Sequence, residues 1–483
     1  MIRDAASERQ VQAADPAAST WLSANAGSGK TRVLTDRVAR LLLNGVEPQR
    51  ILCLTYTKAA ASEMQNRLFR RLGGWAMLDE ANLRKALGEL GVDGSVGQDT
   101  LAQARRLFAR AIETPGGLRI QTIHSFCASL LRRFPLEAGV SPQFTEMDDR
   151  AAKLLRAEIV EEMADHLAPE AFADLAGLFT GEALDQLTDE IARSRPMLAN
   201  PLDRAGALGL FGLPQGVSVQ TLLGEVFLGG EGDLIGQLVA LLAKGKSTDL
   251  SAASRLRMMQ PDLSGLMLLE DVLLSGKAAK VPFAAKIDAF PTKDLRESLG
   301  PLRAPLESLM LRVEAARPRR LALMAAERTL ALHRFAALFL PEYDTRKAMR
   351  GWLDFDDLIG KARALLTDPS VAQWVLFRLD GGIDHILVDE AQDTSPEQWR
   401  VIELLAQEFT AGRGARDTAR TIFVVGDKKQ SIYSFQGADL EAFDAMKLQF
   451  STRLAEVETH LADLTLDYSF RSSPAILTVV DLT

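Results

Sequence analysis

Cysteine, long apolar runs and an apolar start are all scarce or missing in this 483-residue chain. Its two cysteines, Cys53 and Cys127, cannot build a disulfide framework, so we expect a reducing compartment, the cytoplasm, and inert thiols in a core. No run of about 18 apolar residues is present, so we expect no membrane span. The charged start, MIRDAASERQVQAADP, has no apolar stretch and is no secretory signal.

Positive charge is also in short supply, because 56 Lys and Arg face 64 Asp and Glu, a formal net charge of −8. This balance argues against a polycationic coat on nucleic acid. It leaves open a protein that holds nucleic acid along one local groove. The length predicts more than one domain.

Three regions differ in their hydrophobic pattern. Up to about residue 135, short apolar runs alternate with turns and helical patterns, which is typical of β-α units in a parallel sheet. From about 145 to 345, apolar residues recur at helical spacing. From about 350, β-branched runs such as DHILVDE and TIFVVGD return, as in strands buried on both faces. The sequence predicts an α/β fold with a parallel sheet, interrupted by a large, mostly α-helical insertion.

A glycine-rich segment, SANAGSGKT at residues 23–31, lies between a predicted strand end and a predicted helix. Gly27 and Gly29 let backbone N–H groups turn toward phosphate oxygens, and the helix N-terminus adds positive potential. We expect Lys30 to reach the β- and γ-phosphates of ATP, and Thr31 to ligate Mg²⁺. Ala24 stands where the usual pattern has glycine. The alternative interpretation is a chance glycine-rich loop.

Two acids follow the apolar run HILV in HILVDEAQDTS, residues 385–395. Asp389 is predicted to hold Mg²⁺, and Glu390 to orient and deprotonate the attacking water. The alternative is a strand end with solvated acids. Because Lys30 and Asp389 must meet at one nucleotide, the chain between them has to leave the domain and return. Three other carboxylates, in LDFDDL, are predicted to start a helix rather than bind metal: Asp354, Asp356 and Asp357.

The chain resembles the superfamily 1 DNA helicases of the UvrD/Rep type through seven segments in that family's order: SANAGSGKT, ILCLTYTKAAASEM, IQTIHSFC, WLDFDDL, ILVDEAQDTS, VVGDKKQSIYSFQGAD and LDYSFRSS. Its likeness is greatest to the AddA subunit of AddAB helicase–nucleases, of the alphaproteobacterial kind. The segments cover both flanks of the chain, and the helical middle carries little of the signal.

The resemblance implies roles around the nucleotide. Gln10 is similar to the glutamine that reads the adenine edge, and Arg32 to the arginine beside the base. Gln430 is similar to the residue that senses the γ-phosphate, Arg471 to an arginine finger, and Phe470 to a residue that stacks on adenine. The predicted ATP-binding set is Gln10, Ala24, Asn25, Ala26, Gly27, Ser28, Gly29, Lys30, Thr31, Arg32 and Phe470. The predicted catalytic set is Lys30, Glu390, Gln430 and Arg471, with Thr31 and Asp389 at the metal.

The resemblance also implies a track for single-stranded DNA. It would be formed by backbone-contacting and stacking residues, namely Thr55, Tyr56, Thr57, His124, Ser125, Tyr433 and Phe435. Aromatic stacking grips every base and selects none, which suits a motor. Taken alone, each aromatic ring is as consistent with a core position. Phe435-Gln436 replaces the family's usual Trp-Arg pair, so one phosphate-contacting charge is missing.

By this resemblance the chain is expected to contain a RecA-like phosphate-loop ATPase domain in two parts, residues 1–140 and 349–463. A helical 1B-like insertion would occupy 141–348, and 464–483 would be only the start of a second RecA-like domain, as in the N-terminal portion of a longer protein. The implied function is an ATP- and Mg²⁺-dependent 3′→5′ DNA helicase subunit for double-strand break repair and recombination, weakly active or inactive as this portion alone.

The partners implied are DNA, single-stranded or with duplex ends, and an AddB-like subunit, at the nucleoid in the cytoplasm and without a membrane. Two alternatives stay open. One is a UvrD/Rep-type helicase of another repair pathway. The other is a nucleotide-binding interaction module that does not turn ATP over.

Overall fold

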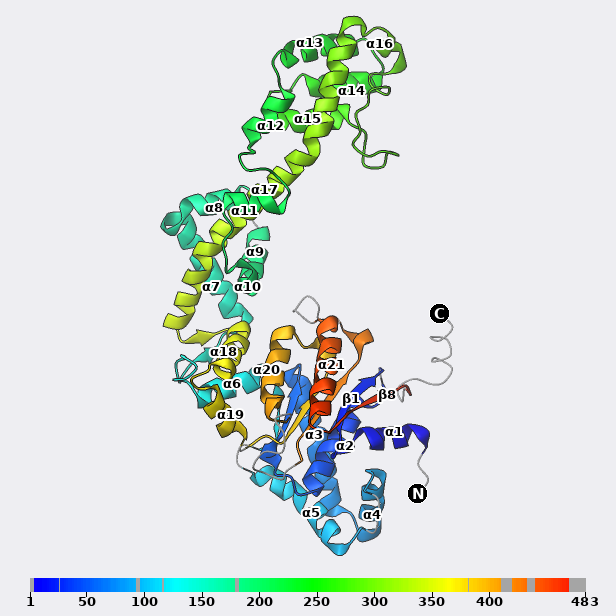
Figure 1. Cartoon of the computed structure of the whole chain (residues 1–483), viewed down its shortest axis with the longest axis vertical. Helices are drawn as coiled ribbons and strands as arrows, with labels where there is room; N and C mark the ends of the chain where they lie inside the picture. The colour runs from blue at the N-terminus through cyan, green and yellow to red at the C-terminus, as the bar shows by residue number, and fades with distance from the viewer. Residues whose placement is uncertain are drawn as a thin grey trace. The chain divides into compact units, whose positions relative to one another are not determined.

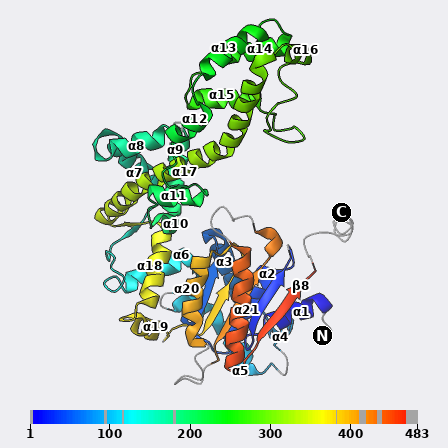
Figure 2. The same ribbon diagram turned by 45° about the horizontal axis from the view of Figure 1, so that its top comes forward.

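The computed structural model of the chain describes residues 4–25, 27–92, 96–114, 117–178, 182–380, 382–409, 419–431 and 439–468. The chain divides into two compact units. Unit 1 comprises residues 1–148 and 348–483, and unit 2 comprises residues 149–347. Figures 1 and 2 show unit 1 as a sheet with helices on both faces and unit 2 as helices.

A six-stranded sheet forms the centre of unit 1, and its described strand pairs are all parallel. The strands run in the order β3 (Arg119–Thr122), β2 (Ile51–Thr55), β6 (His385–Val388), β7 (Thr421–Gly426), β1 (Ser19–Ala24) and β8 (Leu461–Leu466). A second, parallel pair joins β4 (Thr145–Glu146) to β5 (Trp352–Leu353). The predicted α/β fold with a parallel sheet is therefore confirmed.

The helices of unit 1 lie in two groups, one on each face of the sheet. One group is α1 (Ala5–Ala13), α2 (Lys30–Leu43), α3 (Lys58–Met77), α4 (Glu80–Glu89) and α5 (Gln98–Glu113). The other is α6 (Ile123–Arg133), α18 (Phe355–Thr367), α19 (Ala372–Asp380), α20 (Pro396–Ala406) and α21 (Leu440–Glu456). Short 3-10 turns connect some of them, at Pro48–Arg50, Ala391–Asp393, Gln407–Phe409 and Lys428–Gln430.

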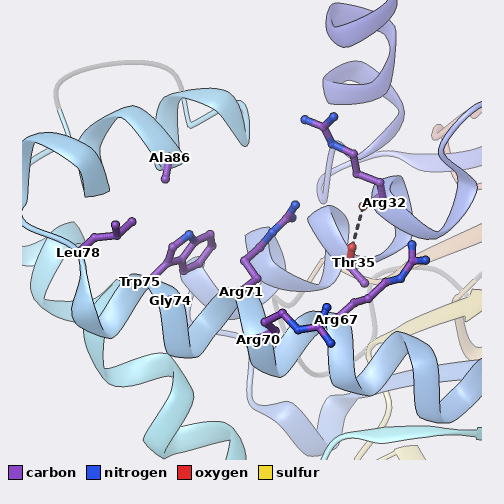
Figure 3. Close-up of a pocket in the computed structure, with 9 residues that line it drawn as sticks. All are labelled: Arg32, Thr35, Arg67, Arg70, Arg71, Gly74, Trp75, Leu78 and Ala86. Atoms are coloured by element: carbon purple, nitrogen blue, oxygen red, sulfur yellow. Dashed lines mark hydrogen bonds between the residues drawn. The ribbon is translucent and has the colours of Figure 1, made fainter. Parts of the chain in front are cut away.

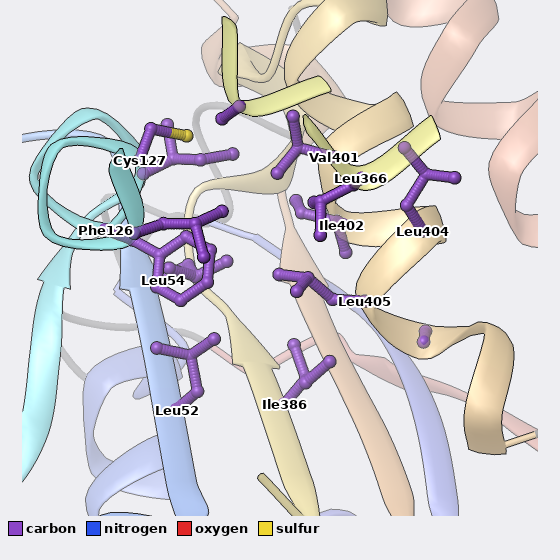
Figure 4. Close-up of a cluster of buried hydrophobic side chains, with 14 of the residues drawn as sticks. Leu52, Leu54, Phe126, Cys127, Leu366, Ile386, Val401, Ile402, Leu404 and Leu405 are labelled. Carbon is purple, nitrogen blue, oxygen red and sulfur yellow. The ribbon is translucent and has the colours of Figure 1, made fainter. Parts of the chain in front are cut away.

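Alternation along the strands separates the two cores. Leu52 and Leu54 of β2 pack with Phe126 and Ile402 in one core (Figure 4). The intervening residue of β2, Cys53, points into the other core with α2 and α3. Every residue of β6 and β7 is buried. Burial on both faces explains why these strands read as continuous apolar runs.

The end of the described chain departs from the predicted domain boundary. Residues 464–466, expected to begin a second domain, are the last three of β8, which pairs with β1 from Ser19↔Leu461 to Ala24↔Leu466. β8 therefore belongs to the sheet of unit 1 and forms one of its edges (Figure 2).

Unit 2 is built from helices. Its first half holds α7 (Asp149–Glu162), a π-helical turn (Met163–Leu167), α8 (Pro169–Ala176), α9 (Glu182–Arg193), α10 (Arg195–Leu198) and α11 (Arg204–Leu210). Its second half holds α12 (Val219–Val226), α13 (Glu231–Leu242), α14 (Ser247–Leu256), α15 (Leu263–Leu273), α16 (Lys293–Glu297), a 3-10 turn (Gly300–Leu302) and the long α17 (Arg303–Met349). The helices α11 to α15 and α17 share one apolar core of their own. In the described residues of the chain, no helix is both long and apolar enough to cross a membrane.

Candidate functional site

The segments singled out in the sequence meet at one edge of the sheet. β6, β7 and β1 are neighbours and run in the same direction. Their carboxyl ends therefore lie side by side, which is where open α/β sheets bind ligands. The edge carries the glycine-rich loop after β1, Asp389 and Glu390 after β6, and Asp427 to Gln430 after β7.

The loop after β1 turns through two glycines in the left-handed region. Gly27 has φ 76° and Gly29 has φ 93°, which a residue with a Cβ adopts only with strain. Gly29 is the N-cap of α2, so the helix begins at Lys30 and its first N–H groups face the loop. A Cβ on Gly29 would also lie 2.6 Å from Nε2 of Gln10. Glycine is thus required here twice, for its φ and for its small size.

Gln10 supports the loop from below. Its side chain is 3% exposed, and Nε2 donates a hydrogen bond to the Ser28 carbonyl at 2.9 Å. Within the described chain, Oε1 of Gln10 and Oγ of Ser28 are buried without a hydrogen-bond partner. Asn25 connects the loop to the sheet edge, because its N–H donates to the Leu466 carbonyl at 3.3 Å. Ala24, in the place of the usual glycine, is the last residue of β1 and is buried.

Lys30 and Glu390, 360 positions apart, form an ion pair. Nζ of Lys30 lies 2.9 Å from Oε2 of Glu390, and the two side chains are 11% and 34% exposed. In the absence of a ligand, the carboxylate therefore occupies the ammonium that was predicted to meet phosphate.

Asp389 lies deeper than Glu390. It is 7% exposed, its N–H donates to the Leu54 carbonyl at 2.9 Å, and its Oδ1 accepts from the Glu390 N–H at 3.0 Å. Burial, and then the negative charge of Glu390, raise the pKa of Asp389 to about 7. The position thus favours a neutral acid until a cation arrives to stabilise the carboxylate.

The backbone at Glu390 is unusual, because its φ of 49° is left-handed and it is not glycine. Such a conformation costs about 1–3 kcal/mol and persists only where the surroundings hold it. Here the Lys30 pair and a hydrogen bond from Nε2 of Gln392 to Oε2 of Glu390, at 2.9 Å, fix the side chain. Strain stored at this turn directs the carboxylate toward the loop after β1.

Gln392 was not predicted, and it is the most connected side chain at this edge. It is 1% exposed, and its Nε2 donates to Glu390 and, at 3.0 Å, to Oδ2 of Asp393. Its Oε1 accepts from the Asp427 N–H at 2.8 Å. A Cβ on Gly426 would approach this Oε1 to 2.9 Å. The amide therefore bridges the segments after β6 and β7, and the glycine that ends β7 was the one sequence signal for so close an approach.

Gln430 is joined to the same network through Asp427. Its Nε2 donates to Oδ2 of Asp427 at 2.7 Å, and Oδ1 of Asp427 caps the following turn by accepting from the Lys429 N–H at 3.1 Å. The five side chains Lys30, Glu390, Gln392, Asp427 and Gln430 thus lie in one continuous region, linked by an ion pair, by side-chain hydrogen bonds and by the Asp427 backbone N–H.

The first residues of α2 complete this part of the site. Thr31 is half-buried in the first turn, directly after Lys30. Arg32 is exposed, and its Nε lies 3.8 Å from Oδ2 of the buried Asp36. Asp36 also contacts a guanidinium nitrogen of Arg71 on α3. The structure therefore holds Arg32 against α3.

Two predicted DNA-contacting segments follow β2 and β3, which are adjacent and parallel. Thr57 caps α3 by accepting from the Ala60 N–H at 3.1 Å, and Oγ1 of Thr55 donates to the Thr57 carbonyl at 3.1 Å. Tyr56 between them is half-buried.

The segment after β3 starts α6 in the same way. The Ser125 N–H donates to Oγ1 of Thr122 at 3.1 Å. The ring of His124 meets the ring of Phe355 edge-on, with centroids 5.0 Å apart, and burial lowers the pKa of His124. Both segments are thus rigid starts of helices at the carboxyl edge of the sheet.

Five predicted site residues lie outside the described residues: Ala26, Tyr433, Phe435, Phe470 and Arg471. The expectation for LDFDDL is confirmed, because Asp354 and Asp357 form a capping box at the start of α18. Across the described ranges, no group of three or more His, Cys, Asp or Glu side chains is placed to hold a metal ion. Cys53 and Cys127 are buried core thiols, as expected, and burial raises the pKa of both.

The donors at this edge fit a magnesium-bound nucleoside triphosphate. The loop and the α2 N-terminus offer N–H groups and a lysine to phosphate oxygens. Asp389 and the Thr31 hydroxyl are the oxygen ligands that Mg²⁺ prefers. The buried, unpartnered oxygens of Gln10 and Ser28 are further polar groups without a protein partner here.

Comparison with protein families finds one match over most of the chain. Residues 5–451 match the model of the UvrD/REP helicase N-terminal domain. This range includes the loop after β1, both acids and Gln430, and it spans unit 2.

Relatives with curated descriptions are similar over nearly the whole chain. A protein of Pelotomaculum thermopropionicum, described as the A-type subunit of an ATP-dependent helicase/nuclease, is 28% identical over 95% of this chain and 37% of its own length. Proteins with the same description from Desulforudis audaxviator and Enterococcus faecalis are 29% and 28% identical, over 95% and 87% of this chain and 38% and 34% of their own lengths. The chain therefore spans little more than a third of the length of these relatives.

Proposed function

Because the chain belongs to the UvrD/REP helicase family, we propose that it is the ATP-binding portion of an AddA-type helicase subunit, of the alphaproteobacterial kind, that moves on DNA by hydrolysing ATP. The proposal extends to 3′→5′ movement in double-strand break repair and recombination at the nucleoid, with DNA ends as substrate and with an AddB-like subunit for its partner. The description shared by the relatives, which names one subunit of a helicase/nuclease, supports a multi-subunit assembly.

One observation carries the proposal. Lys30, Asp389 with Glu390, and Gln430 come from segments up to 400 positions apart along the chain, yet they lie at neighbouring strand ends in one hydrogen-bonded region. A chance glycine-rich loop would not need an ion pair to an acid after another strand. Convergence of a phosphate-binding lysine with a buried acid and a neighbouring carboxylate is what phosphoryl transfer to water requires.

The residues divide the work by their chemistry. Lys30 and the loop N–H groups bind and orient the β- and γ-phosphates, and Thr31 and Asp389 hold Mg²⁺, which neutralises charge on those phosphates. Glu390, once released from Lys30, accepts a proton from the attacking water. Gln430 contacts the γ-phosphate, and its bond to Asp427 carries its position to the segment that follows β7.

Glu390→Gln tests this assignment, with Glu397→Gln as the matched control. Glu397 is an exposed acid seven positions later that pairs with Arg363 on the surface. Single-turnover hydrolysis of Mg·ATP, with and without single-stranded DNA, should fall about 100-fold or more in Glu390→Gln, because an amide cannot accept the proton. Glu397→Gln should hydrolyse as the wild type does. Equal hydrolysis in both variants would leave a nucleotide-binding module, or a different base.

A further inference from the structure

Two adjoining clefts lie along one face of α3, away from the loop after β1. The larger, of about 510 Å³, is lined by Arg32, Thr35, Arg67, Arg70, Arg71, Gly74, Trp75, Leu78 and Ala86 (Figure 3). The smaller, of about 420 Å³, is lined by Ala59, Ser62, Glu63, Asn66, Arg67 and Arg70. Because the clefts share Arg67 and Arg70, they form one continuous surface, which we call the α3 track.

The α3 track is the face that this helix leaves uncovered. Its residues recur every three or four positions from 59 to 78, while Ala61, Met64, Leu68 and Leu72 point into the core. Nineteen steps of 1.5 Å make the track about 28 Å long. It is therefore an elongated groove rather than a pocket for one small ion.

The charge of the track opposes that of the chain. α3 carries Lys58, Arg67, Arg70 and Arg71 but only one acid, Glu63, although the whole chain has a net charge of −8. Glu63 contacts Arg67. Arg70 is exposed, and in the part of the chain that the structure describes it has no ion-pair partner.

The second half of the track is also short of negative charge. Asp36, the acid within reach, is buried and is shared by the guanidinium groups of Arg71 and Arg32. Burial and the repulsion from Arg32 lower the pKa of Arg71. One carboxylate thus faces two guanidinium groups, and an anion in the cleft would relieve their repulsion.

An apolar wall adjoins these charges. Trp75, Leu78 and Ala86 line the far end of the larger cleft, and Figure 3 shows Arg32 and Arg71 reaching toward the same side as the Trp75 ring. A nucleotide combines a phosphate with a flat aromatic base, so this mixture of guanidinium groups and an indole suits it.

The geometry points to a strand of DNA as the occupant: we propose that the α3 track binds the sugar–phosphate backbone of single-stranded DNA, with a base against the wall at Trp75. The basic residues recur about once per helical turn, about 5.4 Å, as a chain of phosphates requires and a lone phosphate does not. The track begins at Lys58, the residue after Thr57, so it continues the segment predicted to touch the strand. The inference rests on the proposed function in taking DNA as the ligand.

Arg70→Glu and Gly74→Glu test the α3 track, with Arg106→Glu as the matched control. Arg70 is exposed, and a Cβ on Gly74 meets no atom within 4 Å, so neither change disturbs the core. Arg106 is an exposed arginine on α5 that lines neither cleft. The measurement is fluorescence anisotropy of a labelled oligo-dT with the 483-residue chain, at several salt concentrations. Melting temperatures establish that each variant is folded.

Each track variant should weaken binding about threefold to tenfold, and the salt dependence should become shallower by about 0.7 for each phosphate that is no longer neutralised. Arg106→Glu should change affinity less than twofold, and Gly74→Ala should bind as the wild type does. Equal losses in Arg70→Glu and Arg106→Glu, or no binding by the wild type at low salt, would overturn the track.

Two further results separate the track from the proposed function. If Tyr56→Ala weakens DNA binding and Arg70→Glu does not, the track is wrong and the helicase assignment stands. If Lys30→Ala still binds one equivalent of ADP, and adding Gly74→Glu abolishes it, the cleft takes a free nucleotide instead of a strand. Unchanged ADP affinity in Arg70→Glu, together with weaker DNA binding, supports the proposal.

Discussion

Lys30 must leave Glu390 before it can meet a phosphate, and this exchange predicts that one substitution tightens nucleotide binding. The pair is 2.9 Å long and its two side chains are 11% and 34% exposed. A charge-assisted hydrogen bond contributes about 1.5–3 kcal/mol when buried, whereas exposed ion pairs contribute about 0–1 kcal/mol. Discounted for the exposure of Glu390, the pair costs about 1 kcal/mol to open. Glu390→Gln should therefore raise Mg·ATP affinity about fivefold.

A double-mutant cycle separates this exchange from simple repulsion between Glu390 and phosphate. Lys30→Ala alone should lower affinity about tenfold or more, because the variant lacks the charge-assisted hydrogen bond to phosphate. In the Lys30→Ala background, Glu390→Gln should change affinity less than twofold, since no lysine is left to release. The difference between the two effects of Glu390→Gln is the coupling energy of the pair.

Calorimetry with a slowly hydrolysed ATP analogue and Mg²⁺ measures all four corners of the cycle. Glu397→Gln, which alters a surface acid, should bind as the wild type does. An equal gain from Glu390→Gln in both backgrounds would show that the ion pair plays no part. Weaker binding in Glu390→Gln would show that Glu390 holds the nucleotide, and would refute the reasoning.

Three further outcomes are expected from stability measurements in urea. Gly29→Ala should destabilise the chain by more than Gly45→Ala, because both glycines have positive φ but only Gly29 would place a Cβ against Gln10, and Gly45 meets nothing within 4 Å; about 1–2 kcal/mol is expected for Gly45→Ala. Asp389 has its pKa raised from 3.8 to about 7, so without metal the folded chain keeps a proton that the unfolded chain has lost between these values. Stability should then fall as pH rises through this window, and Asp389→Asn should be more stable than the wild type at pH 8, by a few kcal/mol, but not at pH 4; equal pH dependence in both would contradict the assignment. Gln392→Ala removes a buried amide with three hydrogen bonds and should cost about 2–4 kcal/mol, and a loss under 0.5 kcal/mol would mean that water replaces it.

The fold was largely predictable because its strands are buried on both faces. The runs HILV and TIFVVG are β-branched and apolar, so β6 and β7 could be placed, and parallel strands bring their carboxyl ends to one edge. β8 escaped because its burial is mixed along LADLTL, as at a sheet edge. The sequence then reads equally well as the start of another domain.

The contacts within the site were less predictable than its residues. The Lys30–Glu390 pair depends on a left-handed turn at Glu390, which no local propensity favours. Gln392 is a neutral amide beside two acids, so its bridging position emerges only when β6 and β7 lie together. Gln10 was expected at the adenine edge, and its amide is engaged with the Ser28 carbonyl in the structure. The roles given to Tyr433, Phe435, Phe470 and Arg471 stay predictions.

The order of strands has a consequence for how this protein is made. β1 lies between β7 and β8, and a hydrogen bond between β7 and Ser19 spans 403 residues. At about 5–20 residues per second, a ribosome needs roughly 20–80 s to supply that partner. During this interval β1 has neither neighbour, while unit 2, which has its own core, is completed. So large a sequence separation is characteristic of slow folding, and the nascent apolar strand is a binding site for chaperones in the cell.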